Sequence, residues 1–386
     1  MKLPPIFSSL SLIVLLTPLT PLPQAEQPPP ELYTGTVLCL PDVYLQPPSD
    51  CLPAGPSTYL ARMAAFGITF PMQPLPAKSP DEELSYVPYN YARVTSGNTP
   101  LFTSLDAAMD GKPVGRRIEV GFNYVSYSRQ AVVDGRAFYF LSTQEWIRGG
   151  DITRITPSSF QGLLFYRTPD RPFAWVLYPI HTKHSPGYTK RDYTTHFLNR
   201  YDVVQIYATE KIEGLDWYMV GPDEWVEQRL VARVIPDSTP PYGVYNRRWI
   251  EINLFEQTIT VYENNQLIFA TLASTGLPGW WTRPGLFRIY KKLVTTSMQG
   301  AFEADRSDFY YLQDVPWSMY FDQERALHGA YWHDGFGYPR SHGCVNLSPG
   351  DSHWLYNWAH AGDWVYVWDP SGKTPTDPDL FPPGSP

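Results

Sequence analysis

The chain has 386 residues, 43% of them hydrophobic and 15% aromatic, which is enough for two or three domains with extensive cores. Its 40 prolines and 13 tryptophans favour short strands and loops over long helices. The formal net charge of −8, without a long basic run, argues against nucleic acid or an anionic membrane surface as the main partner.

The N-terminus is typical of an exported protein. After Met1-Lys2-Leu3, an apolar stretch runs from Ile6 to Leu16, and Ala25 offers a small residue for cleavage. The stretch is shorter than the ~20 apolar residues that a membrane span requires. We therefore interpret residues 1–25 as a secretory signal peptide and expect no membrane span after its cleavage.

Three cysteines are consistent with export. Cys39 and Cys51 lie close together in residues 26–84, a proline-rich segment that we interpret as an extended arm or spacer. They can close a small loop as a disulfide, which leaves Cys344 as the unpaired thiol. The alternative is that all three cysteines stay reduced.

The middle of the chain repeats an aromatic pattern. Phe138-Tyr139 followed by Glu145-Trp146-Ile147 recurs 79 residues later as Trp217-Tyr218 followed by Glu224-Trp225-Val226. An aromatic pair, a polar hairpin and a Glu-Trp-Ile/Val segment predict two short strands in each copy. Matching first strands are expected upstream, at residues 91–94 and 173–176.

Each copy resembles a bacterial SH3-like barrel, in which a Trp-Tyr … Glu-Trp-Val ending is frequent. We place the two modules at residues 85–157 and 158–237, with Trp146 and Trp225 in their cores rather than on ligand platforms. By analogy such modules bind cell-wall peptides. A purely structural spacer is the alternative.

A further domain follows a proline-rich linker. Alternating apolar residues predict strands at residues 249–254, 258–262 and 267–272, and Asn264-Asn265 is a typical hairpin turn. Ser348-Pro349 predicts the start of a short helix, and residues 363–368 predict a closing strand. Residues 370–386 are rich in Pro, Gly and Asp and are expected to be disordered.

One segment of this domain carries the residues for nucleophilic catalysis. It is Ser341-His342-Gly343-Cys344-Val345-Asn346, with His328-Gly329 sixteen residues before the cysteine. A cysteine attacks carbonyls as a thiolate, and a histidine within hydrogen-bond reach can take its proton. Gly343 leaves the backbone open, so that nearby N–H groups can face a developing oxyanion. The segment predicts an acyl-transfer site.

This segment resembles the active-site signature of the YkuD family of L,D-transpeptidases. The resemblance implies that Cys344 is the nucleophile, that His328 is the general base and that His342 shapes the oxyanion pocket. The N–H groups of Gly343 and Cys344 are the expected oxyanion donors.

The resemblance extends over a catalytic domain that we place at residues 243–369. Residues 282–289 resemble the family's Thr-Pro-x-Gly-x-Phe-x-Ile segment, with Arg283 inserted before the proline. Four residues are candidates to bind the substrate: Tyr311, Trp317, Ser341 and Asn346.

The cysteine and histidines have two other interpretations. A lone buried cysteine is usually inert. A zinc site is the second alternative, with His328, His333, His342 and Cys344 as ligands, but the paired spacing of common zinc sites is missing. We therefore expect no metal and no other cofactor, and we expect His333 to be dispensable.

The fold class expected is mainly β: a β-sandwich-like catalytic domain with one short helix, preceded by two small SH3-like barrels. The resemblance implies that peptidoglycan stem peptides are the substrate, in the cell envelope or outside the cell. Cys344 would release D-alanine, and the side-chain amine of a neighbouring stem would take the acyl group. Carbapenem-type compounds are expected to acylate the same thiol.

Three alternatives stay open from the sequence. Water as acceptor gives an L,D-carboxypeptidase, and a protein amine gives lipoprotein attachment, because the shape of the cleft selects the acceptor. A non-catalytic cell-wall-binding protein with a lapsed enzyme domain is the alternative from a different class.

Overall fold

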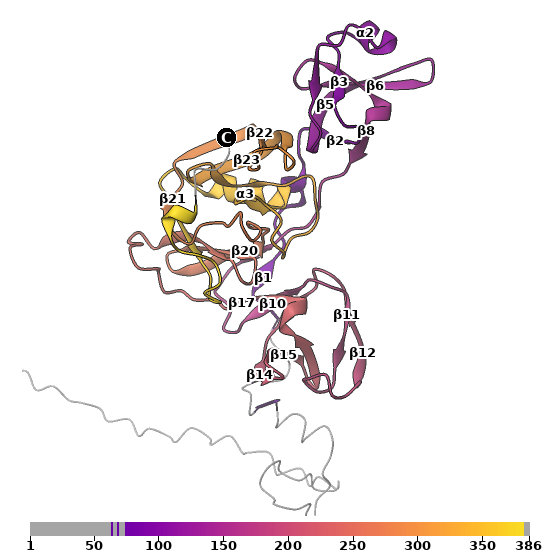
Figure 1. Cartoon of the computed structure of the whole chain (residues 1–386). Coiled ribbons are helices and arrows are strands. Elements are labelled where there is room, and N and C mark those ends of the chain that lie inside the picture. The colour runs from indigo at the N-terminus through magenta and orange to yellow at the C-terminus, as the bar shows by residue number, and fades with distance from the viewer. Residues whose placement is uncertain (1–62, 65–67, 69–73, 382–386) are drawn as a thin grey trace, which may run out of the picture. The chain divides into compact units, whose positions relative to one another are not determined.

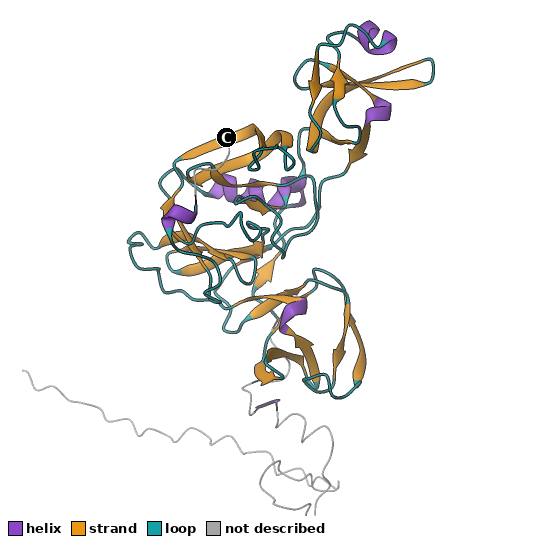
Figure 2. Cartoon of the chain, in the orientation of Figure 1, coloured by secondary structure: helices purple, strands orange, loops and turns teal. Residues whose placement is uncertain are grey.

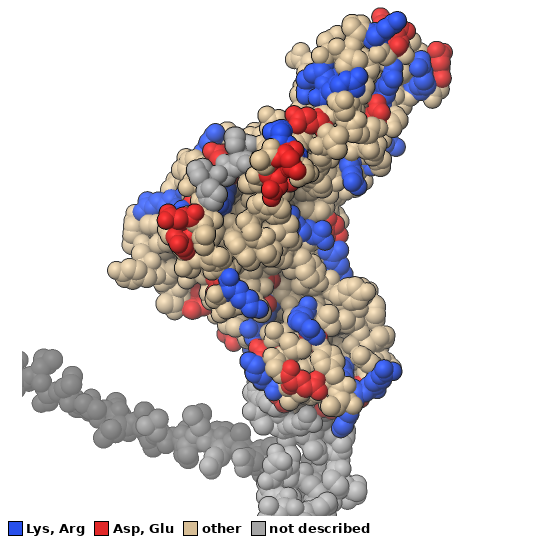
Figure 3. All heavy atoms as spheres, viewed as in Figure 1, with Lys and Arg blue, Asp and Glu red and all other residues tan. Residues whose placement is uncertain are grey.

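The computed structural model describes residues 63–64, 68 and 74–381, which belong to one compact unit (Figure 1). The predicted signal peptide and the Cys39–Cys51 pair lie outside the described residues. Strands dominate the structure, as predicted (Figure 2). In the described part of the chain, no helix has the length and apolar character needed to span a membrane. On the face drawn in Figure 3, acidic and basic side chains are interspersed among neutral ones.

A seven-stranded sheet forms one layer of the catalytic region, in the order β1-β9-β20-β19-β18-β26-β21. Its strands are β1 (Ala77–Lys78), β9 (Leu163–Phe165), β18 (Arg248–Asn253), β19 (Thr258–Glu263), β20 (Gln266–Leu272), β21 (Gly285–Arg288) and β26 (Trp364–Trp368). The predicted turn at Asn264 and Asn265 has φ values of 52° and 62°, as a type I′ hairpin requires.

The second layer is built from β22 (Lys291–Gly300), β23 (Tyr310–Asp322), β24 (Arg325–Gly329) and β25 (Val345–Leu347). A buried apolar core includes residues from both layers, among them Ile250, Val261, Met319 and Leu327. The catalytic region is therefore a β-sandwich with one short helix, as the sequence predicted.

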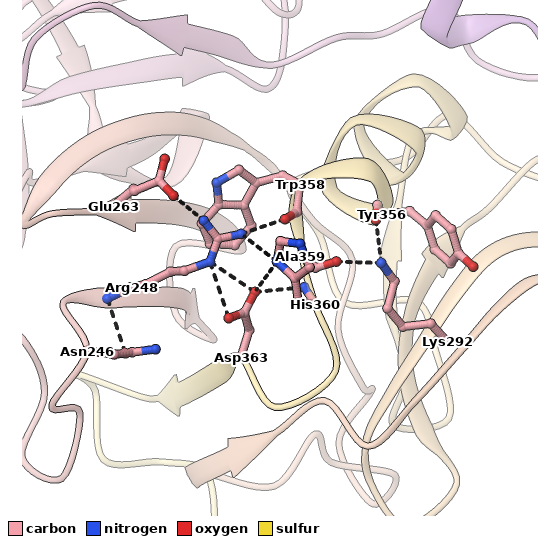
Figure 4. A network of polar contacts seen from close by, with 9 residues as sticks. All are labelled: Asn246, Arg248, Glu263, Lys292, Tyr356, Trp358, Ala359, His360 and Asp363. Carbon is pink, nitrogen blue, oxygen red and sulfur yellow. Dashed lines mark hydrogen bonds and ion pairs between the residues drawn. The ribbon is translucent and has the colours of Figure 1, made fainter.

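That helix is α3 (Pro349–Trp358), and side chains form hydrogen bonds with backbone groups at both of its ends. Ser348 is the N-cap and accepts from the Asp351 N–H, as the sequence predicted. At the other end, Arg248 donates to the Trp358 carbonyl and Lys292 donates to the Tyr356 carbonyl at 2.6 Å (Figure 4). Cations at a helix C-terminus are stabilised by the helix dipole. Since Arg248 is on β18 and Lys292 on β22, the helix is tied to both layers.

The chain before this domain forms two groups of short strands. The first comprises β2 (Asn90–Val94), β3 (Thr99–Leu101), β4 (Arg116–Ile118), β5 (Phe122–Val133), β6 (Arg136–Leu141), β7 (Trp146–Arg148) and β8 (Ile152–Ile155), with helix α2 (Leu105–Asp110) inserted after β3. The second comprises β10 (Phe173–Val176), β11 (Ile180–Lys183), β12 (Tyr193–Leu198), β13 (Val203–Gln205), β14 (Ala208–Ile212), β15 (Leu215–Gly221), β16 (Glu224–Glu227) and β17 (Val231–Val234).

The two groups share one strand register. Tyr139 pairs with Ile147 in the first, and Tyr218 pairs with Val226 in the second. The first and last strands correspond too, because β2 pairs with β8 and β10 pairs with β17. Trp146 and Trp225 therefore hold equivalent positions, although Trp225 is buried and Trp146 only partly so. The assignment of both modules as SH3-like barrels stays a prediction.

Two boundaries and one strand pairing differ from the sequence-based expectation. Strand β9 joins the seven-stranded sheet, so the strands of the second module begin at Phe173 rather than near residue 158. Strand β1, from the predicted arm, pairs with β9 and covers that edge of the sheet. Strand β5 of the first module pairs in parallel with β23, which makes the first module continuous with the second layer of the sandwich.

The C-terminal tail also differs from the prediction of disorder, as far as residue 381. The Asp369 carboxylate accepts from the Thr374 N–H at 2.8 Å, which closes a turn. Phe381 is buried, and the Arg325 guanidinium lies 5.6 Å from the centre of its ring. Local side-chain hydrogen bonds and one buried aromatic ring order a segment whose composition alone suggests disorder.

Candidate active site

Two neighbouring parallel strands bring the predicted nucleophile and base together. His328 on β24 is the Cα partner of Asn346 on β25, so these two side chains point to the same face of the sheet. Cys344 lies two residues before Asn346 and shares that face. The alternate residues Leu327 and Val345 enter the core of the sandwich.

This face of the sheet opens into a cavity of about 370 Å³. His328, Ser341, His342, Cys344 and Asn346 all line it, as do four apolar or aromatic residues of the β22–β23 hairpin, Met298, Phe302, Tyr310 and Leu312. The structure therefore gathers five sequence-predicted residues around one apolar hollow.

Side-chain hydroxyls hold the loop before the cysteine. Ser341 donates to the Cys344 carbonyl at 2.5 Å and accepts from the Gly343 N–H at 3.1 Å. Thr282 donates to the Gly343 carbonyl at 2.9 Å and accepts from the Gly276 N–H at 3.0 Å. The motif glycine adopts φ 118°, a conformation that favours glycine.

These contacts correct one expectation. The Gly343 N–H donates to Ser341, so it is not free to act as an oxyanion donor in this conformation. The oxyanion role of the Cys344 N–H stays a prediction. Ser341 was expected to bind substrate, and its hydroxyl instead supports the loop on both sides of Gly343.

Cys344 carries a free thiol. Burial raises the pKa of this thiol above its ordinary value, although a backbone hydrogen bond from Ala326 and the charge of Arg325 oppose the shift. Its Sγ lies 3.8 Å from the Glu324 carbonyl oxygen. The resting side chain is therefore a protonated thiol at neutral pH, and it needs a base to become nucleophilic.

His328 has the properties of such a base. Its side chain is 1% exposed, and burial lowers its pKa to about 4. The imidazole is therefore neutral at neutral pH and can accept a proton. Its Nδ1 atom is buried and has no hydrogen-bond partner among the described residues.

The ring of His342 lies between aromatic side chains. It stacks on Phe302 with ring centres 5.0 Å apart and on Tyr310 at 5.7 Å, and Trp280 meets it edge-on at 4.5 Å. Burial lowers the pKa of His342, while the Asp308 carboxylate opposes the shift. The ring anchors one wall of the cavity, and its catalytic role stays a prediction.

Two predicted substrate-binding residues lie elsewhere. Tyr311 is buried in the core of the first module, while its neighbours Tyr310 and Leu312 line the cavity. Trp317 stacks on His353 of α3 with ring centres 4.1 Å apart. Residues 310–312 are apolar or aromatic on both faces of the strand, and the sequence alone does not show which face lines the cavity.

Asn346 lines the cavity and contacts a histidine that the sequence suggested to be dispensable. Asn346 Nδ2 and His333 Nε2 lie 3.0 Å apart, and His333 Nδ1 accepts from the Gly335 N–H at 3.1 Å. Burial lowers the pKa of His333 to about 3, so its ring is neutral. A neutral imidazole whose Nδ1 accepts carries its proton on Nε2. His333 therefore holds the Asn346 side-chain amide through this contact.

Within the described residues, no three His, Cys, Asp or Glu side chains are grouped as a metal site would require. The sequence missed the apolar wall made by Met298, Phe302, Tyr310 and Leu312. The sequence signalled this wall only through the aromatic and apolar residues in the two strands before the motif.

Residues 247–367 match the YkuD family model, which describes the L,D-transpeptidase catalytic domain. The resemblance expected from the motif is thereby confirmed for this part of the chain. A comparison with curated proteins finds no match.

Solved structures of L,D-transpeptidases match over part of the chain. A mutant Enterococcus faecium L,D-transpeptidase is 23% identical over 31% of this chain and 49% of its own, with a TM-score of 0.29. One from Stackebrandtia nassauensis is 30% identical over 33% and 57% of the two chains, with a TM-score of 0.26. L,D-transpeptidase 3 from Mycobacterium tuberculosis, in complex with a faropenem-derived adduct, is 21% identical over 44% and 74%, with a TM-score of 0.30. The chain thus spans about half the length of the first of these proteins.

Proposed function

Because residues 247–367 match the YkuD catalytic domain, we propose that this protein is a peptidoglycan L,D-transpeptidase with a cysteinyl acyl-enzyme. The observation that carries the proposal is the shared face of β24 and β25. It presents a thiol and a neutral, buried imidazole to one cavity. A lapsed enzyme domain has no physical reason to keep that arrangement.

In the proposed acylation step, His328 takes the thiol proton and Cys344 Sγ attacks the carbonyl between the diamino acid and the terminal D-alanine. A C–S bond forms, the C–N bond to D-alanine breaks, and the proton passes from His328 to the departing amine. Because burial disfavours both imidazolium and thiolate, proton transfer is expected to accompany attack rather than to precede it.

In the second step, the side-chain amine of a neighbouring stem attacks the thioester. The new C–N bond forms as the C–S bond breaks, and the amine proton returns through His328 to the thiolate. Two carboxylates, Asp308 and Glu324, and two guanidinium groups, Arg325 and Arg340, line the cavity, so its formal charges balance and do not select between an amine and water as the acceptor.

The proposal also covers the cellular location of the protein and a class of inhibitor. The predicted signal peptide supports export to the cell envelope or beyond, with a mature chain that begins near Glu26. The same thiol, which is accessible from the cavity, is expected to form a covalent adduct with carbapenem-type compounds.

The test is mass spectrometry of muropeptides after incubation with the purified protein. Release of D-alanine together with a crosslink between two diamino acids supports the proposal, and release without a crosslink indicates a carboxypeptidase. Cys344→Ala should abolish both release and carbapenem capture, with an unchanged circular dichroism spectrum. His184→Ala is the matched control, because this exposed histidine lies in the second module. A wild-type chain that neither releases D-alanine nor captures a carbapenem would leave only a wall-binding role.

A further inference from the structure

One strand of the catalytic region has two faces with different neighbours. Along β23, Tyr310 and Leu312 line the active-site cavity. Tyr311, which lies between them, and Phe309, just before the strand, are buried in the apolar core of the first module, and Phe309 also lines the cavity. The first module and the active site therefore meet at the start of this strand.

Backbone contacts fix this arrangement. Strand β5 pairs in parallel with β23, with Phe122 opposite Tyr310. The Phe122 N–H donates to the Phe309 carbonyl at 2.8 Å. Further along, the Ser126 N–H donates to the Gln313 side chain at 2.9 Å, a buried contact. These bonds hold the start of β23 against the module.

The hairpin that connects β22 to β23 is held by the same module. Arg306, in the connection, forms an ion pair with Glu119 at 3.0 Å. Both side chains are more than half exposed, so this pair adds little energy and mainly orients the loop. The same connection supplies Phe302 and Asp308 to the cavity wall.

Gly121 permits the close approach. A Cβ atom at this position would lie 2.1 Å from the Phe309 carbonyl oxygen, a distance that no side chain can occupy. Its neighbour Phe122 is 45% exposed and itself lines the active-site cavity. The first module thus contributes a side chain to the site as well as supporting its wall.

We propose that the first module positions the active-site wall, and that Phe122 is a specificity-determining residue for the stem peptide. The module holds the β22–β23 hairpin beside the cavity that Cys344 lines, and this hairpin supplies part of the wall that contacts the donor peptide. This inference rests on the proposed function, since it names the substrate-selecting part of that same site. A spacer or a separate wall-binding module would not need its core completed by Phe309 and Tyr311.

The test uses Gly121→Ala in the full chain. Its matched control is Gly150→Ala in the same module, where an added Cβ meets no atom within 4 Å. Hydrogen exchange of residues 300–312 should become faster in Gly121→Ala only. Because a displaced wall loses contacts that bind the donor, the KM for a tetrapeptide donor should rise by about tenfold or more. Alkylation of Cys344 by iodoacetamide should stay within about twofold, because strands β24 and β25 set the environment of the thiol.

A second variant covers the case in which Gly121→Ala does not fold. Phe122→Ala keeps the strand pairing and removes only the exposed ring, so it should change the preference among donor peptides without faster hairpin exchange. Faster exchange with an unchanged KM, or unchanged exchange in Gly121→Ala, would overturn the inference. A wild-type chain that releases no D-alanine would instead refute the proposed function, and the exchange experiment would still decide whether the module holds the hairpin.

Discussion

Asp351, in the first turn of α3, is a fully buried carboxyl group that predicts a pH-dependent stability. It accepts from the Gly162 N–H at 2.8 Å and from the Thr271 hydroxyl at 2.5 Å. Burial raises its pKa from 3.8 to about 6, although these hydrogen bonds oppose the shift. The folded protein therefore binds this proton more tightly than the unfolded chain does.

The sign and the size of the effect follow from linkage. A carboxyl group with a raised pKa in the folded state contributes stability that is fully present below about pH 3.8 and is lost as the pH rises through about 6. A difference of roughly two pKa units corresponds to about 3 kcal/mol of unfolding free energy. Asp351→Asn keeps the shape of the side chain and cannot ionise, so it should lack this dependence.

The assay is urea unfolding, followed by tryptophan fluorescence, of both chains between pH 4 and pH 7. The free energy of unfolding of the wild type, minus that of Asp351→Asn, should fall by roughly 2.4 kcal/mol over this range, because the stabilisation is not yet complete at pH 4. Glu251, whose pKa burial raises to about 7, is present in both chains and cancels in the difference. Asp170→Asn, at an exposed carboxylate, should give a curve parallel to the wild type. Parallel curves for Asp351→Asn would refute the reasoning.

Three further predictions concern single side chains. His328→Ala should lower the acylation rate steeply at neutral pH and less at high pH, where the Cys344 thiolate forms without a base. In the wild type, acylation should persist down to about pH 4, because the His328 imidazole is protonated only below that pH. His333→Ala should lower kcat by up to about tenfold through loss of one hydrogen bond to Asn346, and His333→Gln, which can still donate, should recover part of it. Arg248→Met should lower the free energy of unfolding by roughly 3–5 kcal/mol, measured by urea titration, because it removes the arginine partner of the buried Asp363 carboxylate and leaves only its contacts with His360.

Each of these has a contrary outcome. If the acylation rate of the wild type already fell below about pH 6.5, the ordinary pKa of histidine, His328 would not be buried in the free enzyme. Full activity of His333→Ala would restore the expectation that this residue is dispensable. A stability of Arg248→Met within about 0.5 kcal/mol of the wild type would show that the ion pairs at the end of α3 contribute as little as exposed ones do.

Local chemistry in the sequence was sufficient for much of the fold. The hairpin at Asn264-Asn265 and the N-cap at Ser348 are found where the sequence predicted them. Period-two alternation located β18, β19 and β20 within about a residue, because one face of each packs in a core. The motif also predicted Cys344 as nucleophile and His328 as base; both side chains line one cavity, and their catalytic roles stay a prediction.

Other features depended on which surfaces meet in the folded chain. Tyr311 and Trp317 are aromatic residues on a strand covered on both sides, and alternation alone cannot say which side is the cavity. The Gly343 N–H was assigned to the oxyanion because the sequence does not reveal that Ser341 folds back to accept it.

The role of the first module is also a tertiary property. Nothing in residues 119–126 marks them as a partner for β23, since a parallel pairing leaves no turn or spacing signal in the chain. Such contacts join residues nearly 190 positions apart, as between Arg306 and Glu119. Their existence depends on the complementary shape and burial of two separately encoded surfaces, and only the folded structure brings these together.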